Sequence, residues 1–310
     1  MICPSNRKEV RSVRLPVFKP ALVLAFGIQL MLCPPKPSLA DEGQLPRFLW
    51  DREGGVPSSM SGTYIRPRQL LVFPFYEHVS DHNQEYNPAK FGFGRNEDFR
   101  GRYGSSSAQM FIAYGVTERL AVELEISYTR ATLEKSSSDT TPMPSKIEES
   151  GLGDVEGQIR LRLAQESGRR PEVFGFLEIT APSQKNKLLI GNSDWDFRPG
   201  VGVVRGFSWG TMTVRTTLEY SKEQSALNEP RQLDIGETSV EYLKRLSHAW
   251  RLNLGFEGGE GGAPDEWELR SGLQWRMTRV LLLKLDNSVG LSSKAPDWTP
   301  QIGLMFSIPR

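Results

Sequence analysis

The chain is poor in cysteine and histidine, with two Cys and three His among 310 residues. Cys3 and Cys33 both lie in an N-terminal segment with the features of a secretory signal, so the remaining chain would carry no thiol. That absence excludes a disulfide framework and a cysteine-based metal site. His78 and His82 lie near acidic residues, where a metal site is conceivable. We expect a solvated loop cluster there, with no metal and no cofactor.

The sequence also lacks a long apolar run. The longest, residues 21–33, has about thirteen residues, too few for a membrane-spanning helix. A basic stretch precedes it and Ser38-Leu39-Ala40 follows, which predicts a signal peptide over 1–40, removed after Ala40. This segment holds six basic residues and one acid, so its removal takes the net charge from +1 to −4. That balance argues against nucleic-acid binding.

After residue 40 no helical period of useful length is present, and a period of two takes its place. Residues 119–129 read R-L-A-V-E-L-E-I-S-Y-T, with Leu, Val, Ile and Tyr on one face and Ala, Glu, Ser and Thr on the other. Successive strand side chains point to opposite faces, so this strand has one apolar side and one polar side. Mean hydropathy, −0.40, does not oppose a membrane barrel, because only alternate strand residues meet lipid.

The same alternation predicts twelve strands. They lie near 69–78, 106–115, 119–130, 152–164, 172–181, 196–206, 211–221, 235–246, 250–258, 266–275, 279–290 and 299–308. The connections alternate between long and short without exception, beginning with a long loop over 79–105. Short periplasmic turns and long external loops produce this rhythm in outer-membrane barrels. We therefore predict an all-β fold over 68–310: a transmembrane antiparallel up-and-down β-barrel in a bacterial outer membrane. Segment 41–67 is interpreted as a disordered periplasmic leader, with a plug into the barrel as the alternative.

Two sets of residues fit this interpretation. Six of the seven tryptophans fall at predicted strand ends and would form two aromatic girdles at the membrane interfaces: Trp195, Trp267 and Trp298 at the outer ends, and Trp209, Trp250 and Trp275 at the periplasmic ends. The glycines at 157, 200 and 202 mark tight curvature or places where a wall side chain would not fit.

Charged residues concentrate on the strand face opposite the apolar stripe, which should face the lumen. The candidates are Glu123, Glu125, Asp154, Glu156, Arg160, Arg162, Glu178, Arg215, Glu219, Glu241, Arg245, Arg251, Glu268, Arg270, Lys284 and Asp286. Their order along the strands predicts an acidic outer half and a basic periplasmic half. Two interpretations stay open. The charges form either internal salt bridges that fill a narrow bore or rings that select solutes.

Nothing in the sequence indicates an enzyme. Barrel hydrolases use a Ser–His pair, and His248 has Ser247 beside it but no acid within three positions. The glycine-rich stretch 254–262 precedes no helix, so it fails the context test for a dinucleotide site. We expect no catalytic residues.

Several short motifs resemble a family of outer-membrane proteins named for the meta-pathway of phenol degradation. They are G-L-G-D-V at 151–155 followed by a strand ending R-L-R-L, the apolar strand 173–181, W-R-L-N-L-G at 250–255 and P-x-I-G-L-x-F at 300–306. The resemblance covers most of residues 69–306. It implies a barrel that passes small, often aromatic or apolar, compounds.

The sequence thus predicts a passive channel for small molecules. Its expected partners are the lipid bilayer, lipopolysaccharide and a small solute. The alternative is a closed structural or binding barrel, with loop 79–105 as its contact surface.

Overall fold

The computed structural model describes residues 55–58, 62–94, 96–167, 169–183, 187–191, 195–220, 233–247, 249–259 and 266–308. The predicted signal peptide 1–40 and most of the segment that follows it lie outside these ranges. Among the described residues, no helix is long and apolar enough to cross a membrane.

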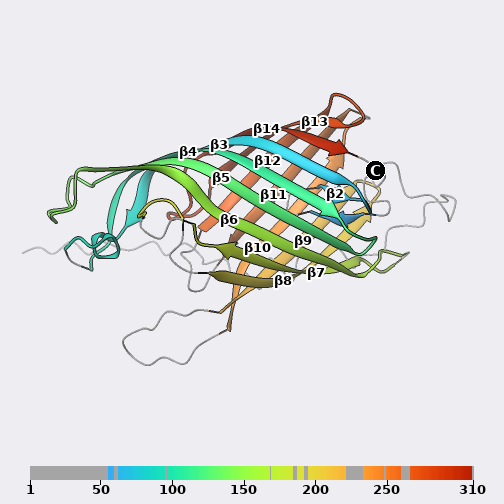
Figure 1. The fold of residues 1–310 in the computed structure, drawn as a ribbon, viewed down its shortest axis with the longest axis horizontal. Helices are drawn as coiled ribbons and strands as arrows, with labels where there is room; N and C mark the ends of the chain where they lie inside the picture. The colour runs from blue at the N-terminus through green and yellow to red at the C-terminus, as the bar shows by residue number, and fades with distance from the viewer. Residues whose placement is uncertain are drawn as a thin grey trace, which may run out of the picture.

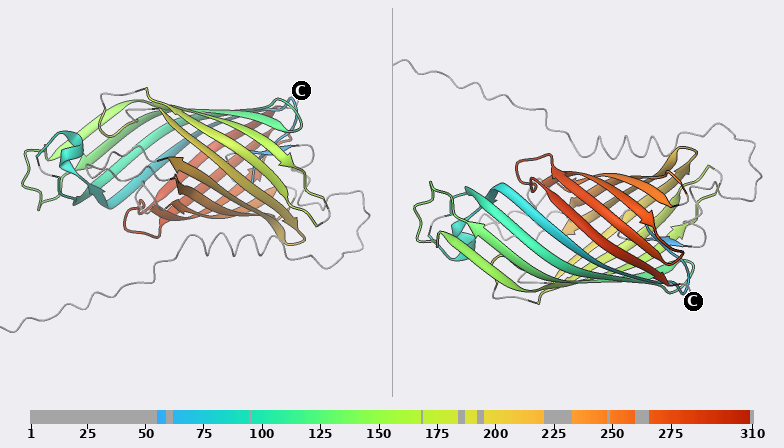
Figure 2. Two further views of the ribbon diagram at one scale, coloured as in Figure 1. Left: turned by 90° about the horizontal axis from the view of Figure 1, so that it is seen from below. Right: turned by 90° about the horizontal axis from the view of Figure 1, so that it is seen from above.

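Twelve antiparallel strands close into a barrel (Figures 1 and 2). In chain order they are β3 (Leu70–Tyr86), β4 (Phe99–Gly115), β5 (Leu120–Glu134), β6 (Lys146–Ala164), β7 (Glu172–Ala181), β8 (Asp196–Phe207), β9 (Gly210–Tyr220), β10 (Leu233–Arg245), β11 (Trp250–Gly259), β12 (Glu266–Arg276), β13 (Leu281–Gly290) and β14 (Thr299–Ile308). Each pairs with its neighbour in sequence, and β14 pairs with β3 to close the ring. The predicted fold class is confirmed.

The period of two explains the wall. On β5, Val122, Leu124, Ile126 and Tyr128 are exposed on the outer surface, whereas Ala121 is fully buried on the inner side. Other strands continue the apolar outer surface, with Ile159 and Leu161 on β6 and Ile302 and Leu304 on β14. A continuous apolar exterior around a polar interior is the arrangement that a lipid bilayer requires.

Four strands are longer than predicted. Their pairing continues outward to Tyr86↔Phe99 between β3 and β4 and to Glu134↔Lys146 between β5 and β6. The predicted loop 79–105 therefore shrinks to residues 87–98, which include the short 3₁₀ helix η2 (Pro88–Phe91). The overhanging strands extend beyond the other strands toward the left of Figure 1. The inner faces of these overhangs are apolar: Tyr86 and Leu133 form a buried cluster with Met143 of the 135–145 loop. On β5 the apolar residues thus change from the lipid-facing side to the inner side, and the alternation that marks a membrane-crossing strand ends there.

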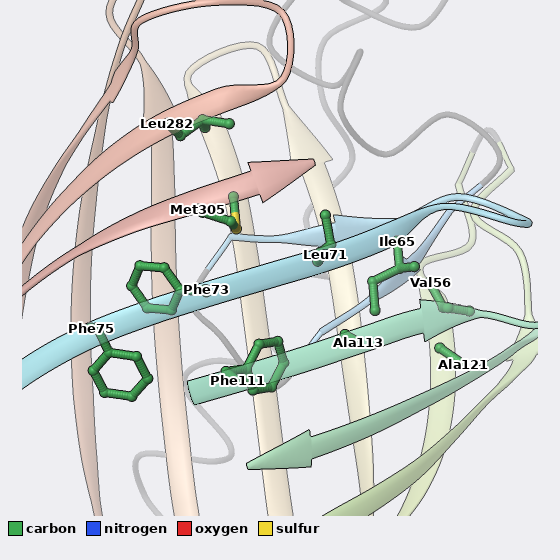
Figure 3. Close-up of a cluster of buried hydrophobic side chains, with 10 residues drawn as sticks. All are labelled: Val56, Ile65, Leu71, Phe73, Phe75, Phe111, Ala113, Ala121, Leu282 and Met305. Carbon is green, nitrogen blue, oxygen red and sulfur yellow. The ribbon is translucent and has the colours of Figure 1, made fainter. Parts of the chain in front are cut away.

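Two further short strands lie at the end of the barrel where the turns are short: β1 (Val56–Pro57) and β2 (Tyr64–Ile65). They form a two-stranded sheet of their own, with no ladder to the barrel. Val56 and Ile65 are 0% exposed and pack against inward-facing residues of the wall (Figure 3). This part of segment 41–67, which we expected to be disordered, is ordered in the structure, and the alternative of a plug stays a proposal. The signal was weak because two-residue strands leave no period to detect.

Candidate functional site: the barrel lumen

The interior of the barrel holds a cavity of about 510 Å³. Residues from all twelve barrel strands line it together with Pro296 of the 291–298 loop. Ligand-binding cavities of drug-sized molecules have volumes of ~300–1,000 Å³. The cavity is therefore large enough for a small solute.

Carboxylates dominate the cavity lining. Ten acidic side chains face four cationic ones, an excess of six negative charges when all are ionised. The acids are Glu77, Glu123, Glu125, Glu156, Glu178, Glu237, Glu241, Glu257, Glu268 and Asp286, and the cations are Arg198, Arg215, Arg270 and Lys284. Glu125 and Glu156 stand directly opposite each other on β5 and β6. Two like charges in directly opposite positions repel each other, and a cation between the two carboxylates would lower that repulsion.

Arg215 on β9 gathers acids from three other strands. Its guanidinium lies 3.1 Å from Glu237, 3.7 Å from Glu257 and 3.9 Å from Glu178, and its Nε donates to Ser239 Oγ at 3.0 Å. Glu257 also pairs with Arg270 at 2.6 Å. These contacts cross-link β7, β9, β10, β11 and β12 through the bore. Internal salt bridging and an acid-rich cavity thus coexist in one lumen.

Arg160 on β6 lies below the cavity and is almost completely buried. Its Nη1 donates to the Ser58 carbonyl of the N-terminal hairpin at 2.7 Å, and its other nitrogens donate to Gln158 Oε1. Its guanidinium carbon lies 5.0 Å from the ring centre of Phe174, and Glu123 lies 3.9 Å from its Nε. The wall therefore fixes this cation and aims one donor at the hairpin.

Aromatic side chains form part of the inner wall. Phe75 and Phe111 line the cavity, and Phe73 stacks on Phe75 with a centroid separation of 4.8 Å. Lys284 Nζ lies 5.2 Å from the centre of the Phe73 ring. This geometry is a cation–π contact.

Two wall glycines make room for aromatic rings. A Cβ on Gly202 would lie 2.1 Å from Phe174, and one on Gly200 would lie 2.2 Å from Phe176, so neither position admits a side chain. This confirms the expectation for both residues. Gly157 differs, because a Cβ there would meet its nearest atom at 3.8 Å.

The structure places the predicted lumen residues in three groups. Ten line the cavity: Glu123, Glu125, Glu156, Glu178, Arg215, Glu241, Glu268, Arg270, Lys284 and Asp286. Four belong to the short-turn end: Arg160, Arg162, Arg245 and Arg251. Asp154 lies nearer the long loops, and the side chain of Glu219 is outside the described residues.

The predicted separation into an acidic and a basic half holds only loosely. Arg198 stands opposite Glu178 in the β7–β8 register, and Arg215 and Arg270 lie among acids at the level of the cavity. At the short-turn end, Glu172 pairs with Arg162 at 3.3 Å. Tilt and stagger between strands offset equivalent positions, which brings bases beside acids.

Asp154 helps to hold an external loop. It follows Gly153 in the β6 stretch where the register with β5 shifts, between Ile126 and Tyr128. Its Oδ1 accepts a hydrogen bond from Ser183 N at 3.0 Å. Glu149, nearer the loop end of β6, accepts from Leu188 N and Leu189 N at 2.8–3.0 Å. The G-L-G-D motif thus has a structural role here.

The described histidines do not converge on one site. His82 pairs with Asp297 at 2.9 Å, whereas His78 Nδ1 lies 3.0 Å from Ser106 Oγ across β3 and β4. No Ser–His pair was expected from the sequence, and the β3–β4 register creates this one by placing His78 directly opposite Ser106. Within the described chain, no carboxylate is hydrogen-bonded to His78, so the pair lacks the group that orients a catalytic base. The described part of the chain also holds no group of three His, Cys, Asp or Glu side chains that could bind a metal ion.

The six girdle tryptophans lie at strand ends as predicted. Trp209, Trp250 and Trp275 mark the short-turn end, and Trp195, Trp267 and Trp298 the long-loop end. Five are exposed, while Trp267 is half-buried and stacks on Phe256 at 4.9 Å. Their assignment to membrane interfaces stays a prediction.

Sequence reasoning missed several lining residues, chiefly Glu77, Arg198, Phe75 and Phe111. In β3 the inward positions before Glu77 hold Leu71, Phe73 and Phe75. These apolar side chains belong to the buried cluster that contains Val56 and Ile65 of the hairpin. Apolar residues therefore occupy both faces of β3, and the alternation that identifies lumen residues elsewhere is lost.

Comparisons with known proteins agree with the fold. No protein-family model matches the chain, and no curated protein matches it. Among solved structures, an outer membrane channel from Pseudomonas putida F1 is similar with a TM-score of 0.55 and 13% identity, covering 82% of this chain and 99% of that one. The translocator domain of the autotransporter NalP from Neisseria meningitidis has a TM-score of 0.49 and 14% identity, covering 84% and 93%. The KdgM porin has a TM-score of 0.47 and 7% identity, covering 76% and 99%.

At these identities the likeness concerns the fold alone. Together with the apolar exterior and the closed ring of twelve strands, it defines the protein as a bacterial outer-membrane β-barrel.

Proposed function

We propose that the barrel is a passive outer-membrane channel for small solutes and that it favours cations. The observation that carries this proposal is the acid-rich cavity inside the wall, where ten carboxylates face four cations. Rings of one charge sign in a pore raise the local concentration of the opposite sign.

The lining also bears on the solute. The resemblance to the phenol meta-pathway family implies aromatic or apolar compounds, and we retain membership of that family as part of the proposal. Phe75 and Phe111 provide one aromatic surface for such a ring. A wholly apolar solute would strip water from the surrounding carboxylates, which is costly. Small polar or cationic molecules, including aromatic ones, fit the lining better.

A second candidate function is a closed structural or binding barrel. The N-terminal hairpin at the short-turn end and the ion pairs around Arg215 favour it. An enzymatic role is not part of the proposal; among the described residues the His78–Ser106 pair has no carboxylate hydrogen-bonded to the imidazole.

The test is the reversal potential of the full chain in a planar bilayer under a KCl gradient. We expect cation preference, and a smaller preference when Glu125→Gln and Glu156→Gln reduce the negative excess from six to four. The matched control is Glu148→Gln, an exposed glutamate of the β6 overhang that is absent from the cavity lining.

Each outcome has a definite meaning. Anion preference in the unmodified protein would contradict the charge argument. An unchanged reversal potential in the double variant would remove both residues from the path. A correctly folded barrel that never conducts, with or without the hairpin displaced, would favour the closed-barrel alternative.

A further inference from the structure

We propose that the β1–β2 hairpin is an internal plug that closes the periplasmic mouth of the barrel, and that withdrawal of this hairpin opens the channel. The inference rests on the proposed channel function. It concerns the state in which the channel is held and the residues that hold it.

The hairpin spans the bore. On one side, Val56 and Ile65 pack with Phe111, Ala113 and Ala121 of β4 and β5 (Figure 3). On another, the Ser58 carbonyl accepts from Arg160 on β6. Gly62, which precedes β2, lies against β10, where a Cβ on this glycine would lie 2.7 Å from the Leu243 methyl carbons.

The wall meets the hairpin with two apolar clusters. One comprises inward residues of β3, β4, β5, β13 and β14 around Val56 and Ile65, including Leu71, Phe73, Leu282 and Met305. The other joins Tyr64 to Phe174, Phe176 and Val204 on β7 and β8. Inward apolar residues would be unfavourable in an open aqueous pore, and the docked hairpin covers them.

Little space remains between the cavity and the hairpin. Arg215 and Glu241 line both the large cavity and a second space of about 10 Å³, which Ser58, Thr63 and Tyr64 of the hairpin also line. That volume is about the minimum for one water molecule. A solute that leaves the cavity toward the periplasm would therefore meet the hairpin.

The hairpin can move without dismantling the wall. It shares no ladder with the barrel sheet and joins β3 through a tight turn at residues 66–69. In this turn Gln69 N donates to Arg66 O at 3.1 Å, and Arg68 adopts a left-handed conformation with φ of 62°. Arg68 N donates to Gly115 O at 2.6 Å, which anchors the turn to the end of β4. Residues 66–69 are the hinge.

Arg160 is the residue that holds the hairpin in its docked position, and we call it the latch. Gln158, Phe174 and Phe176 fix its guanidinium on the wall, and its bond to the hairpin ends on a backbone carbonyl. Loss of this donor leaves a buried carbonyl without its charged partner when the hairpin is docked. A hydrogen bond to a charged group is strong enough to shift a two-state equilibrium about tenfold or more.

The first experiment locks the hairpin in the full chain. Ile65→Cys with Ala113→Cys joins the hairpin to β4, where both side chains are fully buried in one cluster (Figure 3). In a planar bilayer we expect the oxidised protein to lose conductance and dithiothreitol to restore it. Each single-cysteine variant is the control and should respond to neither treatment. A pair that fails to cross-link, or one that cross-links without loss of conductance, overturns the proposal.

The second experiment weakens the latch. We expect Arg160→Met to raise the ratio of open to closed time about tenfold. Arg162→Met is the matched control, because Arg162 is also buried on β6 but pairs with Glu172 and the Glu118 carbonyl. Heat-modifiable gel migration verifies that both variants fold. Equal gating in both variants would contradict the latch. Absence of conductance in every variant, oxidised or reduced, would overturn the channel itself, so the two failures are distinguishable.

Discussion

Arg215 offers the sharpest test of how the lumen is held together. Replacing it with Met keeps most of its length and removes one charge that three glutamates share, at 3.1, 3.7 and 3.9 Å. The Arg215 side chain is 14% exposed, and Glu178, Glu237 and Glu257 are 26%, 36% and 13% exposed. The site therefore lies between a dry interior and a water-filled pore.

The magnitude follows from that intermediate position. Removing one partner of a buried ion pair costs about 3–5 kcal/mol, whereas an exposed pair contributes about 0–1 kcal/mol. Water in the cavity screens part of the loss, and Glu257 keeps Arg270 as a partner. We expect Arg215→Met to lower the free energy of unfolding by about 2–3 kcal/mol. Adding Glu237→Gln should recover part of this loss, because it removes a carboxylate left without its cation.

The assay is urea unfolding of the protein folded into lipid vesicles, with the folded fraction read from gel migration. Arg198→Met is the control, since its pair with Asp196 at 2.6 Å is more than one-third exposed at both side chains and should contribute less than about 1 kcal/mol. If Arg215→Met and Arg198→Met cost the same, or if the effects of Arg215→Met and Glu237→Gln are simply additive, the shared-cation network does not stabilise the barrel.

Two further predictions concern other parts of the molecule. Gly202→Val should destabilise the barrel by about 1–3 kcal/mol, because its Cβ would overlap Phe174, while Gly157→Ala should not, and thermal unfolding monitored by gel migration would compare them; equal midpoints would contradict the packing argument. In the external loop 135–145, burial raises the pKa of Asp139, but hydrogen bonds from Thr141 and Tyr86 and the Lys135 ammonium outweigh it, so this pKa lies below its ordinary value. A carboxyl group with a lowered pKa stabilises the folded loop at pH values above its unfolded-state pKa, and this stabilisation is lost as pH falls through its folded-state pKa. Amide exchange in the loop, corrected for its intrinsic rate, should therefore accelerate below about pH 4. The Asp139→Asn variant should show no such acceleration.

The strands were predictable because the residue types on the two faces of each strand reflect lipid on one side and the lumen on the other. On β5, lipid selects Val122, Leu124 and Ile126 and the lumen selects Glu123 and Glu125, so a period of two is present in the residues themselves. Charged cavity residues on β6, β9 and β12 were found for the same reason. The overhangs of β3 to β6 were not, because apolar residues such as Tyr86 and Leu133 lie there on the inner face, in a cluster with Met143 of an external loop.

The sequence by itself determined the closed antiparallel ring, its apolar exterior and the presence of charge inside. These properties follow from local alternation and from the rhythm of long and short connections. Only the tertiary structure decided which acid meets which base, since tilt and stagger place Arg215 among glutamates of three other strands. It alone also placed the hairpin across the bore, where Arg160 reaches a carbonyl 102 residues away along the chain. Contacts between segments so distant depend on closure of the ring, and no local pattern encodes them.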